Sequence, residues 1–261
     1  MTDKIVKSIP LSAVMRERGY GYFDPIIACD ADGVLVDLET RMEEHAAQMM
    51  EDKRYPVNLA TSRTYFHHRD PATRISKDEI GHLLRELMNQ TRGGIGDLEF
   101  YPGAVKAIKN ARKAGISTRV LTSLPGAFDS SADNGQSYAW GTARELRTQQ
   151  FLTAGVIQEE NHIVFCGAHE KPDWMLDRLL LHIPLLIDDR ASTLISASVD
   201  HGLIAVGIVS QRTLAIPSGK GLLDRYGVTW FNSLSQAMPH VITVFNKMER
   251  KGLLRGYTGE V

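Results

Sequence analysis

Cysteine is scarce in this chain, which has two copies, Cys29 and Cys166, among 261 residues. Each stands at the end of a short apolar run, where a reduced and buried thiol fits better than a disulfide. We therefore expect two free thiols and a cytoplasmic protein.

Long apolar runs and an excess of charge of one sign are also missing. No stretch approaches the roughly 20 apolar residues that a bilayer-spanning helix needs. The N-terminal residues, MTDKIVKSIPLSAV, lack the continuous apolar core of a signal peptide. The formal net charge is −1 at pH 7, so the chain as a whole does not attract nucleic acid or an anionic membrane. We expect neither a nucleic acid polymer nor a membrane among its partners.

The hydrophobic residues that are present follow an alternating pattern. Short apolar runs alternate with amphipathic helical stretches, which is typical of a parallel sheet with helices on both faces. The predicted strands cover residues 25–30, 117–122, 162–166, 184–188 and 203–209, with an edge strand at 228–231. The predicted helices cover residues 103–114, 138–154, 172–182, 190–201 and 233–251, and we expect Pro239 to interrupt the last of them.

One segment lacks any strand pattern. From Leu38 onward, apolar residues recur at helical spacing, and Ser76 and Glu79 form a capping box before a second helical stripe. We therefore predict a helical cap at 38–97, inserted after the first strand of a core made of residues 1–37 and 98–261.

Polar residues follow four of the predicted strands. In parallel α/β sheets, ligands bind outside the carboxyl ends of the strands, so these residues are the candidates for a site. They are Asp30 and Asp32, Thr122 and Ser123, Lys171, and Asp188 and Asp189. Clustered carboxylates need a cation, and Mg²⁺ prefers oxygen ligands. A hydroxyl and an ammonium group can hold phosphate oxygens.

The spacing of Asp30 and Asp32 favours phosphoryl transfer. One carboxylate can attack phosphorus and form an aspartyl-phosphate that water then cleaves. A second carboxylate two residues on can protonate the leaving oxygen and later activate the water. The two aspartates would also share the metal, one through its side chain and the other through its backbone carbonyl.

Four strings in this order resemble the four motifs of the haloacid dehalogenase superfamily. They are DADGVLVD (30–37), RVLTS (119–123), HEKP (169–172) and LLIDDR (185–190). The resemblance spans about residues 25–210 and implies a Rossmann-like core, a Mg²⁺ cofactor and catalysis through an aspartyl-phosphate.

By position, Asp30 resembles the nucleophile of that superfamily and Asp32 its general acid/base. Asp188 resembles the Mg²⁺ ligand, and Asp189 resembles a further ligand or a supporting carboxylate. The dehalogenases of the superfamily lack the second aspartate of the first motif, so the presence of Asp32 implies phosphoryl transfer to water.

The resemblance also assigns the groups that would hold phosphate. Thr122 and Lys171 resemble the phosphate-stabilising pair, and the backbone N–H of Ser123 is a further candidate donor.

Further strings resemble the 5′(3′)-deoxyribonucleotidases of this superfamily. They are YPGAVKAI (101–108), LTSLP (121–125), SYAW (137–140) and LLIDD (185–189). The resemblance implies a cap that selects small phosphorylated substrates and a 5′-nucleotide as substrate. The alternative is a phosphatase or phosphotransferase that acts on another small ester, such as a sugar phosphate. In the cap, His67, His68 and Arg69 either meet the substrate or form a solvated loop.

Two interpretations from other classes stay open. A receiver-type signalling domain also combines an acidic pair, a threonine and a lysine, but its acidic pair comes first in the chain and its lysine last, whereas here an Asp-x-Asp leads and the adjacent acidic pair comes last. A regulatory protein could keep the fold without activity, although every motif residue is present. We expect a Mg²⁺-dependent phosphomonoester hydrolase whose candidate partners are a small phosphate ester, above all a nucleotide, and a second copy of the chain in a homodimer.

Overall fold

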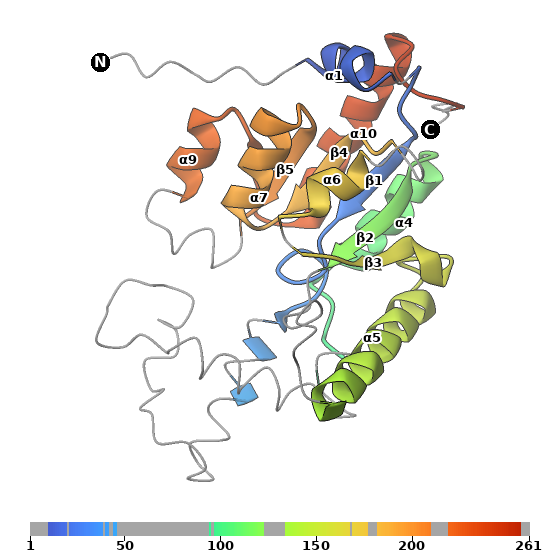
Figure 1. Cartoon of the computed structure of the whole chain (residues 1–261), viewed down its shortest axis with the longest axis vertical. Helices are drawn as coiled ribbons and strands as arrows, with labels where there is room; N and C mark the ends of the chain where they lie inside the picture. Colours follow the sequence, from blue (N-terminus) through green and yellow to red (C-terminus); the bar gives the residue numbers. More distant parts are fainter. Residues whose placement is uncertain are drawn as a thin grey trace.

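The computed structural model of the chain describes residues 10–19, 21–38, 40–41, 44–45, 94, 97–122, 134–167, 169–176, 182–209 and 219–256 (Figure 1). Most of the predicted cap, 38–97, lies outside these residues, so the cap remains a prediction. Its described residues at 38, 40–41 and 44–45 are helical. None of the helices in the described part of the chain has the length and apolarity that crossing a bilayer requires.

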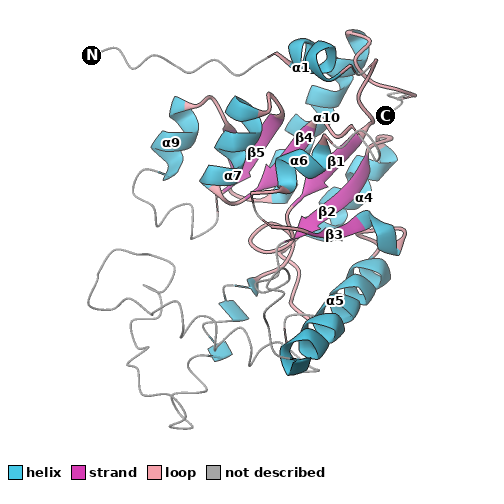
Figure 2. Ribbon diagram, viewed as in Figure 1, coloured by secondary structure: helices cyan, strands magenta, loops and turns pink. Residues whose placement is uncertain are grey.

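Six parallel strands form one sheet in the order β3-β2-β1-β4-β5-β6 (Figure 2). Their bounds are β1 Ile26–Cys29, β2 Ser117–Thr122, β3 Ile163–Phe165, β4 Leu185–Asp188, β5 Ile204–Ile208 and β6 Thr229–Phe231. The predicted parallel α/β architecture is thereby confirmed, with β6 at the edge as expected. The order reverses beside β1, which pairs with β2 on one side and β4 on the other. Such a switch point is where open α/β sheets bind their ligands.

Helices cover both faces of this sheet (Figures 1 and 2). Their bounds are α1 Leu11–Arg18, α4 Ala104–Lys113, α5 Asn134–Ala154, α6 Lys171–Met175, α7 Ala191–Ile195, α9 Gly219–Arg225 and α10 Leu234–Arg250. Short helical turns precede β3 at Glu160–His162 and follow α7 at Ser196–Asp200. The helix predicted at 190–201 therefore consists of α7 and a π-helical turn.

The buried strand β1 feeds two apolar cores because its side chains alternate between the faces of the sheet. Ile27 and Cys29 pack in the cluster that holds Phe245 of α10. Ala28 packs in the cluster that holds Met15 of α1 and Met175 of α6. Because β1 packs against a core on each face, its carboxyl end is fixed, and this end fixes the position of the acidic residues that follow.

The expected interruption at Pro239 is wrong, because α10 runs without a break through this residue. Proline removes one backbone donor, but the residues on either side remain helical, and the stripe that includes Ala237, Val241 and Phe245 stays buried along the helix. Ser233 caps the start by accepting a hydrogen bond from the Gln236 N–H at 3.3 Å. Packing along one face therefore outweighs the local cost of the proline.

We expect Pro239→Ala to stabilise the protein. The substitution restores a backbone donor at an exposed position inside a helix, where proline costs about 3 kcal/mol relative to alanine. About 1 kcal/mol of that gain is offset because the unfolded chain becomes more flexible. Urea unfolding should therefore show a free energy of unfolding higher by about 2 kcal/mol with an unchanged slope. The exposed control Lys247→Ala on the same helix should stay within about 0.5 kcal/mol of wild type, and a loss of stability in Pro239→Ala would contradict the account.

Candidate metal and phosphate site

Asp30 begins the site at the carboxyl end of β1. Its N–H donates to the Ile187 carbonyl of the neighbouring strand at 2.9 Å, which continues the ladder by one residue. Its Oδ1 accepts a hydrogen bond from the Ala31 N–H at 2.7 Å, and its Oδ2 lies 2.7 Å from Nζ of Lys171. The carboxylate is thus buried and held by a backbone donor and an ammonium group.

Lys171 is the first residue of α6, and its side chain is 0% exposed. Its ammonium group donates to Oδ2 of Asp188 at 2.8 Å and also contacts Asp30, so it lies between the residues that end β1 and β4. Burial alone would lower the pKa of Lys171, but the two carboxylates outweigh burial and raise this pKa above its ordinary value. The ammonium group is therefore charged at any physiological pH.

The pKa of Asp30 is raised as well, but chiefly by burial. Burial raises the pKa of Asp30 to about 6; Lys171 opposes this rise, and Asp188 and Asp32 add to it. Arg190, beside the acidic pair of β4, also has a raised pKa, because the surrounding aspartates outweigh its burial. The site therefore combines burial with several mutually repelling carboxylates beside Lys171 and Arg190.

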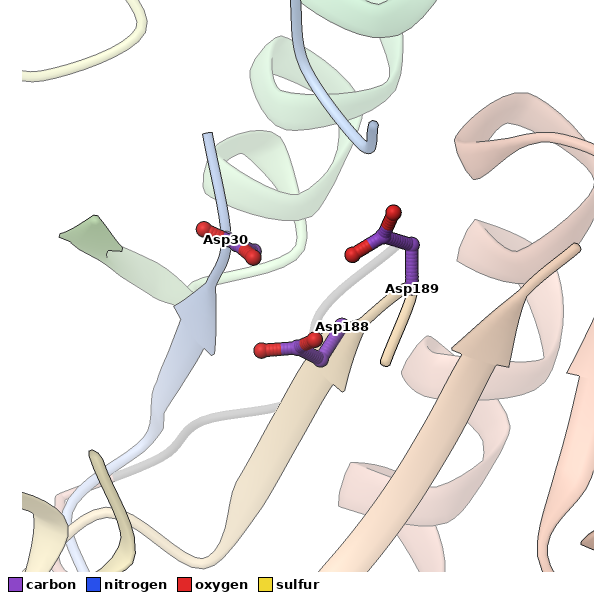
Figure 3. Close-up of side chains that lie close together, drawn as sticks. All are labelled: Asp30, Asp188 and Asp189. Carbon is purple, nitrogen blue, oxygen red and sulfur yellow. The ribbon is translucent and has the colours of Figure 1, made fainter. Parts of the chain in front are cut away.

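Three carboxylates at this edge of the sheet are placed to hold a cation. Asp30, Asp188 and Asp189 each bring one oxygen to within 4.8 Å of the others (Figure 3). Mg²⁺ binds oxygen at about 2.0–2.1 Å, so opposite ligands lie about 4 Å apart, and small side-chain movements would close this set around the ion. The chemistry of the donors and their spacing both fit the predicted Mg²⁺.

Asp32 lies two residues after Asp30 but has a different partner. Its two carboxylate oxygens accept hydrogen bonds from Nη2 and Nη1 of Arg147 on α5, at 2.9 and 3.1 Å. Nη1 also donates to Oγ1 of Thr122, at the end of β2, at 3.2 Å. The Asp32 side chain is therefore engaged by Arg147 and is not part of the three-carboxylate cluster, and metal binding through its backbone carbonyl stays a prediction.

Arg147 is a site residue that the sequence analysis missed. It is 0% exposed and lies four positions after the buried Ala143 and four positions before the buried Phe151. An arginine within a buried helical stripe is unusual, because a buried cation needs a partner. This spacing was the signal that could have found it.

The structure therefore brings most of the predicted residues to one edge of the sheet. Asp30, Lys171, Asp188 and Asp189 lie together, and Asp32 and Thr122 are joined through Arg147. Ser123 falls outside the described residues, so its role remains a prediction.

A tight turn carries the chain from Asp30 away from the sheet. The N–H groups of Leu35 and Val36 donate to the Ala31 carbonyl at 2.8 and 2.9 Å, and Gly33 has a φ of +80°. A Cβ at Gly33 would overlap Oδ2 of Asp189. Glycine is thus required here both by the backbone conformation and by the carboxylate beside it.

No protein-family profile and no curated protein sequence matches the chain. Its fold is similar to that of solved structures. A protein from Bacteroides vulgatus, provisionally named beta-phosphoglucomutase, matches with a TM-score of 0.51 and 16% identity over 94% of this chain and 96% of that one. A haloacid dehalogenase-like family hydrolase from Streptococcus pneumoniae matches with a TM-score of 0.51 and 15% identity over 82% and 97%. The chain therefore has an α/β, Rossmann-like fold of the haloacid dehalogenase type.

We expect Gly33→Ala to destabilise the protein and to weaken its binding of a divalent cation. A left-handed conformation costs a non-glycine residue about 1–2 kcal/mol, and the new methyl group must also displace the Asp189 carboxylate. Disturbing the surroundings of a metal ligand typically costs about 10- to 100-fold in affinity. Calorimetric titration with Mg²⁺ or Mn²⁺ and urea unfolding measure the two effects.

Gly19→Ala is the matched control for this prediction. Gly19 has a φ of +72°, and a Cβ added there would meet nothing within 4 Å, so this variant carries the backbone strain without the clash. It should lose about 1–2 kcal/mol of stability from the backbone strain alone, less than Gly33→Ala, and bind the cation as wild type does. Equal cation affinity in both variants would contradict the placement of Asp189 in the site.

Proposed function

We propose that the protein is a Mg²⁺-dependent phosphomonoester hydrolase that works through an aspartyl-phosphate on Asp30. The observation that carries the proposal is the buried lysine between Asp30 and Asp188, with a three-carboxylate cluster beside it. A nucleophile, a cation site and a fixed ammonium group within one small volume are what in-line transfer of a phosphoryl group needs.

Each residue then has a definite task in the first half of the reaction. A carboxylate oxygen of Asp30 attacks phosphorus, the bond from phosphorus to the ester oxygen breaks, and Asp32, which is protonated at the start of the cycle, gives that oxygen its proton. Lys171 and Thr122 stabilise the charge on the phosphoryl oxygens. Mg²⁺, held by the side chains of Asp30, Asp188 and Asp189 and by the Asp32 carbonyl, would supply further charge neutralisation.

In the second half, water cleaves the aspartyl-phosphate. Asp32, now deprotonated, takes a proton from the attacking water, and the bond between phosphorus and the Asp30 oxygen breaks. Inorganic phosphate leaves, and both aspartates return to their starting states, so atoms and protons balance over the cycle.

The proposed substrate is a small phosphate ester, in the first place a 5′-nucleotide. The strings that resemble deoxyribonucleotidases favour the nucleotide. The name of the structural neighbour from Bacteroides vulgatus refers to a sugar phosphate and favours the alternative. We also propose a cytoplasmic location, which suits two free, buried thiols, and the pKa of Cys166 is raised by burial to about 12.

We expect the purified protein to release inorganic phosphate from a small ester in the presence of Mg²⁺. Chelation by EDTA should abolish the release, and added Mg²⁺ should restore it. Asp30→Asn should lower kcat by at least about 1,000-fold, since loss of a nucleophile removes the reaction path. Its fold should persist, because Lys171 keeps Asp188 as a partner. Activity in Asp30→Asn equal to that of wild type would refute the mechanism, and a wild-type protein inactive on every ester would favour a silent regulatory role.

The substrate class is tested by a panel of esters. We expect kcat/KM for 5′-deoxynucleotides and 5′-ribonucleotides to exceed kcat/KM for hexose and pentose phosphates by about tenfold or more, because contacts with the base add about 1–3 kcal/mol of discrimination. Turnover of sugar phosphates alone would replace the nucleotidase assignment and leave the chemistry at Asp30 intact.

A further inference from the structure

We propose that Arg147 is a positioning residue for the proton transfers, which holds the carboxylate of Asp32 and orients the hydroxyl of Thr122. The inference rests on the proposed phosphatase function and adds a residue outside the four motifs. The guanidinium group contacts Asp32 and Thr122, so its effect on the reaction would pass through these two residues.

The geometry of the ion pair supports this role. Two nitrogens of the guanidinium group donate to the two oxygens of Asp32 at 2.9 and 3.1 Å, which fixes the plane as well as the position of the carboxylate. The arginine side chain is 0% exposed and that of Asp32 is 9% exposed, so water cannot easily replace the contact. A group that gives a proton to the leaving oxygen, or takes one from the attacking water, must lie at hydrogen-bonding distance from it, and a fixed carboxyl group does so without a search over rotamers.

The contact with Thr122 adds a second constraint. Because Nη1 of Arg147 donates to Oγ1, the threonine oxygen accepts there, and its own hydrogen is left to donate elsewhere. A hydroxyl with this orientation is suited to a phosphoryl oxygen. One guanidinium group therefore links the end of β2 to the turn after β1. It orients the Asp32 carboxyl group and the Thr122 hydroxyl, on which the proposed reaction depends.

Arg112 makes a purely structural contact near the end of α5, the helix that carries Arg147. Arg112 of α4 donates to the backbone carbonyls of Gly155 and Val156, just after the end of α5, at 3.1 and 3.2 Å. These contacts anchor α5 to the core through its backbone and not through a predicted catalytic residue. Substituting Arg112 therefore tests the structural support of α5, whereas substituting Arg147 tests the support of Asp32 and Thr122.

The test uses the dependence of the reaction on the leaving group. 4-Nitrophenolate leaves from phosphorus with little need of a proton, whereas the alkoxide of an alkyl ester needs one. We expect Arg147→Met to lower kcat/KM by about 100-fold for the alkyl ester that wild type turns over fastest, which is the scale of general acid catalysis. For 4-nitrophenyl phosphate the loss should be about tenfold smaller. A general loss of stability or of positive charge would affect both substrates equally.

A double-mutant cycle tests whether Arg147 acts through Asp32. Asp32→Asn alone should produce the same contrast between the two substrates, and Arg147→Met added to Asp32→Asn should not enlarge it. Any further loss in the double variant should be the same for both substrates, since it reflects Thr122. The double variant also removes both buried charges, so it provides a folded protein if Arg147→Met alone is unstable.

Two further variants complete the experiment. Arg147→Lys keeps the charge but not the two parallel hydrogen bonds, and we expect an intermediate contrast. Arg112→Met should lower the melting temperature and leave the ratio between the two substrates as in wild type. An unchanged ratio in Arg147→Met and Arg147→Lys, or fully additive effects with Asp32→Asn, would overturn the inference. If wild type hydrolyses neither ester, the proposed function fails, which is a different result from an active wild type with an unchanged ratio.

Discussion

The contact of Lys171 with Asp30 and Asp188 is the interaction on which the arrangement of this site depends. Cys29 and Ile187 are partners in the ladder between β1 and β4, so the residues that follow them stand side by side at the edge of the sheet. Two buried carboxylates in that position would repel each other strongly without a cation between them. The ammonium group provides that cation and so reduces the repulsion between the two carboxylates.

Such a contact contributes little net stability, because removing ions from water costs about as much as their attraction returns. The stability must come from elsewhere, and the two apolar cores supply it. β1 is buried along its whole length and gives side chains to both. A sheet held on both faces can carry a charged site at its edge, and it keeps the charged groups in place with little motion.

The sheet and much of the site could be predicted from sequence because both follow from local patterns. Short apolar runs mark parallel strands, and parallel strands place Asp30 and Asp188 at one edge whatever the intervening chain does. Arg147 could not be found in this way, since it reaches the site from the middle of a helix, 115 residues after Asp32. The expected break at Pro239 is wrong because the local effect of proline on a helix is outweighed by the packing of the buried face of α10. The helix α1 was not predicted from sequence, although Pro10 and the left-handed Gly19 mark its two ends. It is short and weakly amphipathic, so its apolar residues give little helical pattern.

The two aspartates at the end of β1 show how one turn gives like residues different surroundings. Asp30 stays in line with the strand and faces Lys171 and the acidic pair of β4. Asp32 is carried round by the turn at Gly33 and meets Arg147 instead. Asp30 thus pairs with Lys171 and Asp32 with Arg147, and these two separate cations reduce the repulsion between the carboxylates. The proposed mechanism needs its nucleophile near a metal and a phosphate and its acid/base near the ester oxygen, and separate cations allow these positions to differ. Two aspartates only two residues apart therefore have different partners because the chain turns at Gly33 and α5 brings an arginine into the core.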